Sequence, residues 1–139
     1  MNRVGSTCKD SYSIDVVLRH QSVTREAISE ALLLEPNTSQ TKAFYARLVE
    51  GNKSTEYEVA LRKVVLFIQS HVTFWKEFIG SGGEVELVLN HTICAMDEVG
   101  DKCFELELYP EFLEQIYSSG FALRIQGWQG DSQQESAPK

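Results

Sequence analysis

The stretch EVELVLNHTI, at residues 84–93, decides the class of fold. Its odd-numbered positions carry Val, Leu, Leu, His and Ile, which alternate with Glu, Glu, Val, Asn and Thr. A period of two residues is typical of a β-strand with one buried face. The same alternation recurs at residues 12–20, 104–108 and 121–126. The sequence therefore predicts a sheet built from these segments.

Three further segments have the spacing of helices. The first, within residues 24–36, begins at a threonine that can cap it and cannot continue through its proline. In residues 55–79, apolar side chains recur every three or four residues, which predicts one helix of about 24 residues. β-branched residues inside that pattern leave a break in the helix open. Residues 110–120, with proline first and glycine last, predict a further helix.

These elements favour an α+β fold. The predicted architecture is a ferredoxin-like βαββαβ sheet with helices on one face and the long helix inserted in the first crossover. Residues 44–49 have a weak strand pattern, and a mixed sheet that includes them is the alternative. We expect a mobile segment at residues 1–11, one domain at residues 12–128 and a disordered tail at residues 129–139.

Composition argues against several classes of function. The chain has 139 residues and a formal charge of −7, without a Lys/Arg cluster, so nucleic-acid binding is not expected. No apolar run approaches the roughly 18 residues that a membrane helix needs, and the first residues do not resemble a secretory signal. Three cysteines are too few for a disulfide scaffold, and at least one of them cannot pair within the chain, which favours a reducing compartment. We therefore expect a cytoplasmic protein.

Cys94 and Cys103 are a candidate pair of thiols. A hairpin that sets His91 opposite Leu106 would set these cysteines opposite each other, with about 4.5 to 5.5 Å between their Cβ atoms. Two reduced thiols without a role are the expected state, a redox switch is the alternative, and no second pair of ligands has zinc spacing. His91 lies on the predicted buried face without an accompanying catalytic motif. We therefore predict no catalytic residue, no metal site and no cofactor.

The outer face of the predicted sheet is the other candidate site. Acidic residues of adjacent predicted strands gather there: Asp15, Glu84, Glu86, Glu105 and Glu107. Tyr109 and Trp128 share this face and could anchor a partner, because aromatic residues are enriched among interface hot spots. The alternative is an ordinary solvated face, whose charge Arg19 and Arg124 partly balance.

A family resemblance rests on several stretches of the chain: ISEALLLEP at residues 28–36, Ser39, Lys42, residues 104–108, PEFL at residues 110–113 and SGFAL at residues 119–123. These stretches resemble an uncharacterised bacterial family called domain of unknown function 4279. The resemblance implies a single bacterial domain. It brings no established activity and no catalytic residue.

These observations favour a non-enzymatic protein-binding module, of immunity or regulatory type, that engages a basic protein partner through the acidic face. A small-molecule-binding regulatory domain, with its pocket between the sheet and the long helix, is the first alternative. An enzyme that uses His91 or Cys103 in an unrecognised site is the second. The oligomeric state is open.

Overall fold

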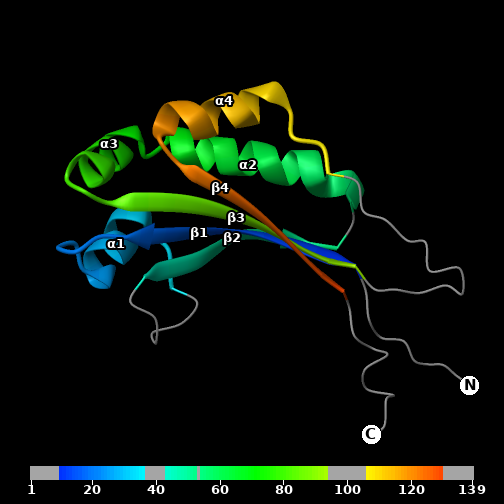
Figure 1. The fold of residues 1–139 in the computed structure, drawn as a ribbon, viewed down its shortest axis with the longest axis horizontal. Helices are drawn as coiled ribbons and strands as arrows, with labels where there is room; N and C mark the ends of the chain where they lie inside the picture. Colours follow the sequence, from blue (N-terminus) through cyan, green and yellow to red (C-terminus); the bar gives the residue numbers. More distant parts are fainter. Residues whose placement is uncertain (1–9, 37–42, 53, 94–105, 130–139) are drawn as a thin grey trace, which may run out of the picture.

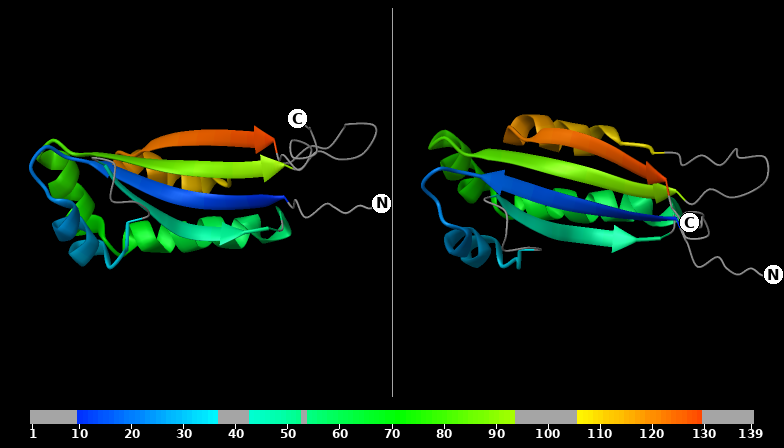
Figure 2. Two further views of the ribbon diagram at one scale, coloured as in Figure 1. Left: turned by 90° about the horizontal axis from the view of Figure 1, so that it is seen from below. Right: turned by 60° about the horizontal axis from the view of Figure 1, so that its bottom comes forward.

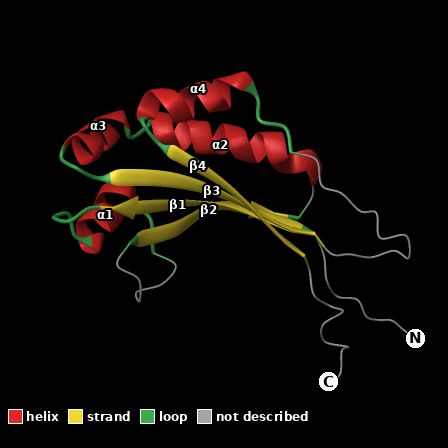
Figure 3. Ribbon diagram, in the orientation of Figure 1, coloured by secondary structure: helices red, strands yellow, loops and turns green. Residues whose placement is uncertain are grey.

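The structure is a computed structural model that describes residues 10–36, 43–52, 54–93 and 106–129. The described chain forms one four-stranded sheet and the helices that pack against it (Figure 1). In chain order the elements are β1 (Ser11–Arg19), α1 (Arg25–Leu32), β2 (Phe44–Gly51), the short 3-10 helix η1 (Ser54–Glu56), α2 (Tyr57–Gln69), α3 (Val72–Gly80), β3 (Glu84–Ile93), α4 (Pro110–Ser119) and β4 (Ala122–Gln129). The predicted α+β class is confirmed (Figure 3). Within the described ranges, no helix has the length and apolar character needed to cross a membrane.

The sheet is mixed, and its strand order is β2-β1-β3-β4. β1 is antiparallel to both β2 and β3, whereas β4 is parallel to β3. Parallel neighbours need a crossover, and α4 lies in the connection between β3 and β4. Residues 44–49 lie within β2, so the alternative of a mixed sheet that includes them is confirmed. The ferredoxin-like order is not confirmed.

The predicted hairpin between residues 84–93 and 104–108 is wrong. β1 and β4 occupy the two sides of β3, and His91 lies opposite Tyr12 and Gly127, not opposite Leu106. Residues 106–109 are described and form no strand. A period of two shows which side chains share a face but does not choose the partner strand. Cys94, Cys103 and Glu105 lie outside the described residues, so the thiol pair stays a prediction.

The predicted long helix is two helices, α2 and α3, separated at Ser70 and His71. The indole Nε1 of Trp75 donates a hydrogen bond to the carbonyl of Ile68 at 2.9 Å, and the Ser70 hydroxyl donates to the carbonyl of Phe67 at 3.0 Å. These bonds satisfy carbonyl groups at the end of α2. The apolar pattern continues across the break because both helices bury one side in the same core.

One hydrophobic core lies between the helices and one face of the sheet (Figure 1). Even-numbered residues of β1 and odd-numbered residues of β3 belong to it, together with buried residues of α1, α2, α3 and α4. The opposite face of the sheet, called the outer face below, carries none of the described helices (Figure 2). Side chains on the outer face are therefore positioned by the sheet without being part of the main core.

Candidate functional site

The centre of the outer face holds a buried carboxylate. Asp15 of β1 has no exposed surface, although it points away from the main core. Its Oδ2 accepts hydrogen bonds from the Tyr45 hydroxyl at 2.8 Å and from Asn90 Nδ2 at 2.9 Å, and its Oδ1 accepts one from Arg47 Nε at 3.1 Å. The donors come from β2 and β3, the two neighbours of β1. Asp15 thus joins three strands into one polar network, called the Asp15 network below.

An irregularity in β2 shapes this network. Arg47 lies opposite Asp15 and Glu50 lies opposite Ser13, so β2 has one more residue than β1 across this interval. In a regular strand, residues three apart point to opposite faces, whereas a bulge shifts the alternation by one residue. Arg47 and Glu50 therefore share the outer face, and their side chains form an ion pair at 3.2 Å. The same irregularity explains why residues 44–49 have a weak strand pattern.

The electrostatics of the network keep its donors protonated. Burial, followed by the hydrogen bond to Asp15, raises the pKa of the Tyr45 phenol. The hydrogen bond to Asp15 also raises the pKa of the Arg47 guanidinium. Both side chains therefore present fixed N–H and O–H donors at neutral pH, and both are tied to the same carboxylate.

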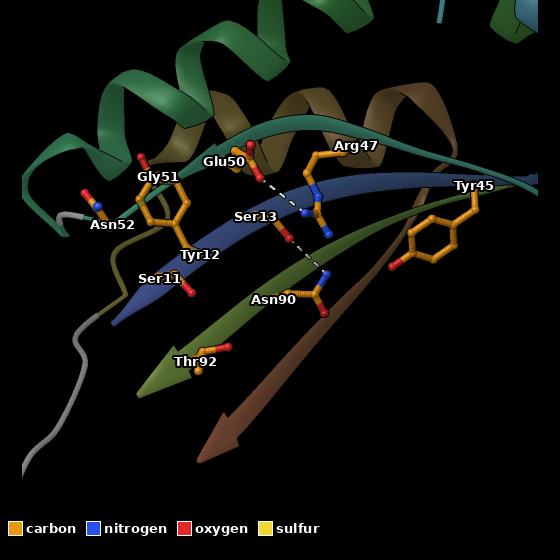
Figure 4. A pocket seen from close by; sticks show the side chains of 10 residues that line it. All are labelled: Ser11, Tyr12, Ser13, Tyr45, Arg47, Glu50, Gly51, Asn52, Asn90 and Thr92. Carbon is orange, nitrogen blue, oxygen red and sulfur yellow. Dashed lines mark hydrogen bonds and ion pairs between the residues drawn. The ribbon is translucent and has the colours of Figure 1, made fainter. Parts of the chain in front are cut away.

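An open pocket of about 620 Å³ lies beside the Asp15 network (Figure 4). Its lining is mostly polar and comes from β1, β2 and β3 and from the residue that follows β2: Ser11, Tyr12, Ser13, Tyr45, Arg47, Glu50, Gly51, Asn52, Asn90 and Thr92. Asn90 Nδ2 donates to Asp15 and, at 3.4 Å, to the Ser13 hydroxyl, which fixes the orientation of its amide group. The pocket therefore offers both donors and acceptors for hydrogen bonds.

The predicted acidic patch is largely compensated by arginines. Glu86 accepts a hydrogen bond from Arg124 Nε at 2.9 Å and lies 3.8 Å from an Arg19 nitrogen, and its side chain is only 14% exposed. Asp15 is fully covered, as described above. Among the predicted acidic residues on the described strands, Glu84 remains exposed. The charges of the outer face are thus largely paired. Arg19 and Arg124 balance part of its negative charge, as the alternative of an ordinary solvated face required.

Two of the predicted partner-binding residues lie elsewhere. Glu107 and Tyr109 are in the connection that precedes α4, which is not a strand, and they line a second pocket of about 820 Å³ beside the start of α2. The Arg62 guanidinium of α2 stacks over the Tyr109 ring at 4.4 Å. Their assignment to the sheet face is wrong because it assumed a strand at residues 104–108. Trp128 pairs with Thr92 through the β4 backbone.

Sequence reasoning missed Tyr45, Arg47 and Asn90. Asn90 shares the predicted face of Glu84 and Glu86, but the predicted site was defined by its carboxylates and so did not include a neutral side chain. Tyr45 and Arg47 alternate with core residues of β2, and the bulge obscured that pattern. The sequence signal for these residues was the alternation of polar side chains in residues 44–47 and 84–92. The fold places these two segments on either side of Asp15.

A contact between His20 and Ser81 resembles a base and its nucleophile, but the hydrogen bonds exclude that role. His20 Nδ1 accepts from the backbone N–H groups of Ser22 and Val23, so the ring proton is on Nε2. Nε2 then donates to the Ser81 hydroxyl at 2.9 Å and cannot remove its proton. The contact links the end of α3 to the residues after β1. Among the described residues, no group of three His, Cys, Asp or Glu side chains could hold a metal ion.

His91 points into the core, as predicted, and is 5% exposed. Its ring lies 5.2 Å from that of Tyr57, which in turn packs edge-on against Tyr12 at 5.1 Å. Burial lowers the pKa of His91. Its surroundings are those of a structural histidine in an aromatic cluster.

We expect His91 to make stability depend on pH. The unfolded chain binds a proton at this histidine below about pH 6.5, whereas the folded protein resists protonation because its pKa is lowered. The free energy of unfolding should therefore be highest above pH 6.5 and decrease as the pH falls toward the folded-state pKa. Denaturant titrations across this window should show a smaller pH dependence for His91→Asn than for the wild type. If the free energy of unfolding depends on pH equally in the two proteins, His91 is not the source of the pH dependence.

The comparisons give this site no relative from which a role could be transferred. No protein-family model, curated protein or solved structure matches the chain.

Proposed function

We propose that this chain is a non-enzymatic binding module that engages a protein partner through the outer face of its sheet. The observation that carries the proposal is the Asp15 network. Burying a carboxylate destabilises a fold unless donors surround it, and here the donors are side chains of the uncovered face. The network holds Tyr45 and Arg47 in fixed positions, which lowers the entropy lost when a partner binds.

The composition of the face fits a protein partner. Tyrosine and arginine are enriched among the residues that dominate binding energy. Val17 and Val88 are buried between the longer polar side chains, so the face combines an apolar layer with a polar rim. The exposed carboxylates of Glu50 and Glu84, with the net charge of −7, favour a basic partner. The resemblance to domain of unknown function 4279 adds a bacterial setting to this proposal.

A small polar ligand in the pocket beside the Asp15 network is the second candidate. The pocket falls in the usual size range for ligand sites and offers hydroxyl, amide and guanidinium groups. A pocket between the sheet and the long helix, which the sequence suggested, is not favoured: Leu61, Val64 and Ile68 of α2 have no exposed surface there and fill that space. A ligand would therefore meet the same face that we propose for a protein partner.

Two matched charge reversals test the proposal. In the outer-face variant, Glu50→Lys is combined with Glu84→Lys. In the control, Glu77→Lys of α3 is combined with Glu114→Lys of α4, both exposed on the helical side. The two variants have equal net charge, so nonspecific electrostatic effects are equal. Captured proteins from the source cells are identified by mass spectrometry at low and high salt, and their affinities are then measured by calorimetry.

The expected result is a salt-sensitive protein partner whose affinity falls at least about tenfold in the outer-face variant and stays unchanged in the control. Thermal unfolding of both variants should match the wild type, because surface ion pairs contribute about 0 to 1 kcal/mol. Loss of the partner only in the control would place the interface on the helices. Absence of a protein partner would favour the small ligand instead.

A further inference from the structure

The two edges of the sheet are built differently. β2, at one edge, has the bulge and carries Arg47 and Glu50. β4, at the other edge, keeps an unbroken register with β3 from Ala122 to Gln129, and its sequence ALRIQGWQ contains one charged residue and no proline. Bulges, charges and prolines are the features that keep an edge strand from pairing with another chain. The β2 edge is protected in this way, and the β4 edge is not.

Apolar side chains flank the β4 edge on the helical side. Ile125 lies in register with the core residue Leu89, yet it is 51% exposed because no described strand lies beyond it. Leu113 and Tyr117 of α4 are 43% and 86% exposed. In β4 itself, Arg124 is the only charged residue and points to the outer face with Glu86. The helical side of this edge is therefore apolar.

The exposed apolar residues of α4, Leu113 and Tyr117, lie on the side of the helix nearest this edge. On the other side of the helix, Gln115 Oε1 accepts a hydrogen bond from Gln69 Nε2 of α2 at 3.0 Å. Phe112 and Ile116 point into the core. Leu113 and Tyr117 each follow a core residue by one position, about 100° further round the helix and away from α2. Because α2 packs on β2 and α4 on β4, that side faces outward beyond β4.

We propose that β4 pairs with β4 of a second copy of this chain, antiparallel and about a two-fold axis at Ile125. The unpaired backbone of an edge strand binds an extended segment, and an identical strand satisfies it. In this register Ile125 meets its own copy, Arg124 meets Gln126, and Leu123 meets Gly127. No two like charges are opposed, which matters because opposed like charges destabilise strand pairs.

The symmetry has a consequence for the rest of the molecule. An axis perpendicular to the sheet keeps both helical layers on one side, so the exposed rows of the two α4 helices approach each other above the new strand pair. The two sheets become one continuous sheet, and both outer faces point the same way. The dimer does not depend on the proposed function, although it would present two binding faces to one partner.

Sedimentation equilibrium over a wide range of concentration tests the proposal. We expect the wild type to dimerise. Ile125→Lys places two lysines opposite each other, and its dimer dissociation constant should rise at least about tenfold. Leu66→Lys adds the same charge at an exposed apolar position of α2 and should leave the constant unchanged. A wild type that stays monomeric at every concentration would overturn the proposal, as would a dimer that Ile125→Lys does not weaken.

A second variant tests the dimer independently, in case Ile125→Lys fails to fold. Directly opposed residues of antiparallel strands lie close enough for a disulfide, so Ile125→Cys should give a covalent dimer on mild oxidation. Leu66→Cys, in the same background of native cysteines, should not exceed the wild type in cross-linking. Equal cross-linking of the two variants on a non-reducing gel would overturn the two-fold register.

Discussion

Replacing Asp15 with alanine should lower the free energy of unfolding by about 3 kcal/mol. The change removes the acceptor of three hydrogen bonds, from Tyr45, Arg47 and Asn90. Hydrogen bonds to a charged group contribute about 1.5 to 3 kcal/mol each. The summed loss is reduced because the Arg47 side chain is 44% exposed and regains bonds to water. The expected value is therefore at the low end of the cost of breaking a buried ion pair.

Urea titrations followed by circular dichroism would measure this effect. Glu84→Ala is the matched control, because Glu84 is an exposed carboxylate of the same face, and its substitution should change stability by less than about 0.5 kcal/mol. Asp15→Asn keeps the size of the side chain but turns one acceptor into a donor, so an intermediate loss of about 1 to 2 kcal/mol is expected. An Asp15→Ala variant as stable as Glu84→Ala would show that the network does not hold the face together.

Replacing Trp75 with alanine should destabilise the protein by about 4 kcal/mol. Trp75 is 2% exposed, and its ring packs against Phe67, Phe74 and Phe121. Alanine would leave a cavity where α3 meets the sheet and would remove the hydrogen bond to the Ile68 carbonyl at the end of α2. Because a domain is typically stable by about 5 to 15 kcal/mol, this loss is a large fraction of the total.

A phenylalanine variant separates the contribution of ring packing to stability from that of the indole hydrogen bond. Trp75→Phe keeps an aromatic ring but removes the indole N–H, so it should cost about 1 to 3 kcal/mol, less than alanine. Leu66→Ala, at an exposed position of α2, serves as control and should change stability by less than about 0.5 kcal/mol. Chemical unfolding followed by circular dichroism gives all three values. Equal stability of Trp75→Ala and the wild type would mean that the junction of α2 and α3 does not depend on this ring.

The two predictions address different parts of the molecule. Trp75 belongs to the main core and to the junction of two helices, whereas the Asp15 network lies on the opposite face of the sheet. Loss of the core residue should lower stability without changing which surface binds. Loss of Asp15 should also free Tyr45 and Arg47, and under the proposed function it should weaken binding of the partner. Stability and affinity measured on both variants therefore distinguish a structural role from a binding role.

Much of the fold could be predicted because local patterns reflect local geometry. Residues 12–20, 84–93 and 121–126 alternate with a period of two and coincide with β1, β3 and the first part of β4 to within one residue, apart from the later end of β4. The caps at Thr24, Pro110 and Gly120 lie at the ends of α1 and α4, where their side chains or backbone angles suit a helix end. Each of these signals depends on a few neighbouring residues, which is why the sequence contains it.

The candidate site could be predicted only in part. Asp15, Glu84 and Glu86 do share the outer face, as alternation requires. The sequence analysis placed Arg19 and Arg124 on this face, but it could not show that both reach Glu86, and it did not identify the donors to Asp15. Tyr45 and Arg47 reach Asp15 only because β2 pairs with β1, and Arg124 reaches Glu86 only because β4 is parallel to β3. Whether a carboxylate is an exposed charge or a buried acceptor depends on these pairings.

The sequence by itself determined the α+β class, the faces of β1 and β3, the start of α1 and both ends of α4, because periodicity and capping act over a few residues. Tertiary structure alone decided that β1 and β4 flank β3, that the long apolar pattern breaks at Ser70 and His71, and that Asp15 is buried on the outer face. These features depend on contacts between segments far apart in the chain. Many such pairings are compatible with the same alternation, and only the packing of the complete core selects one of them.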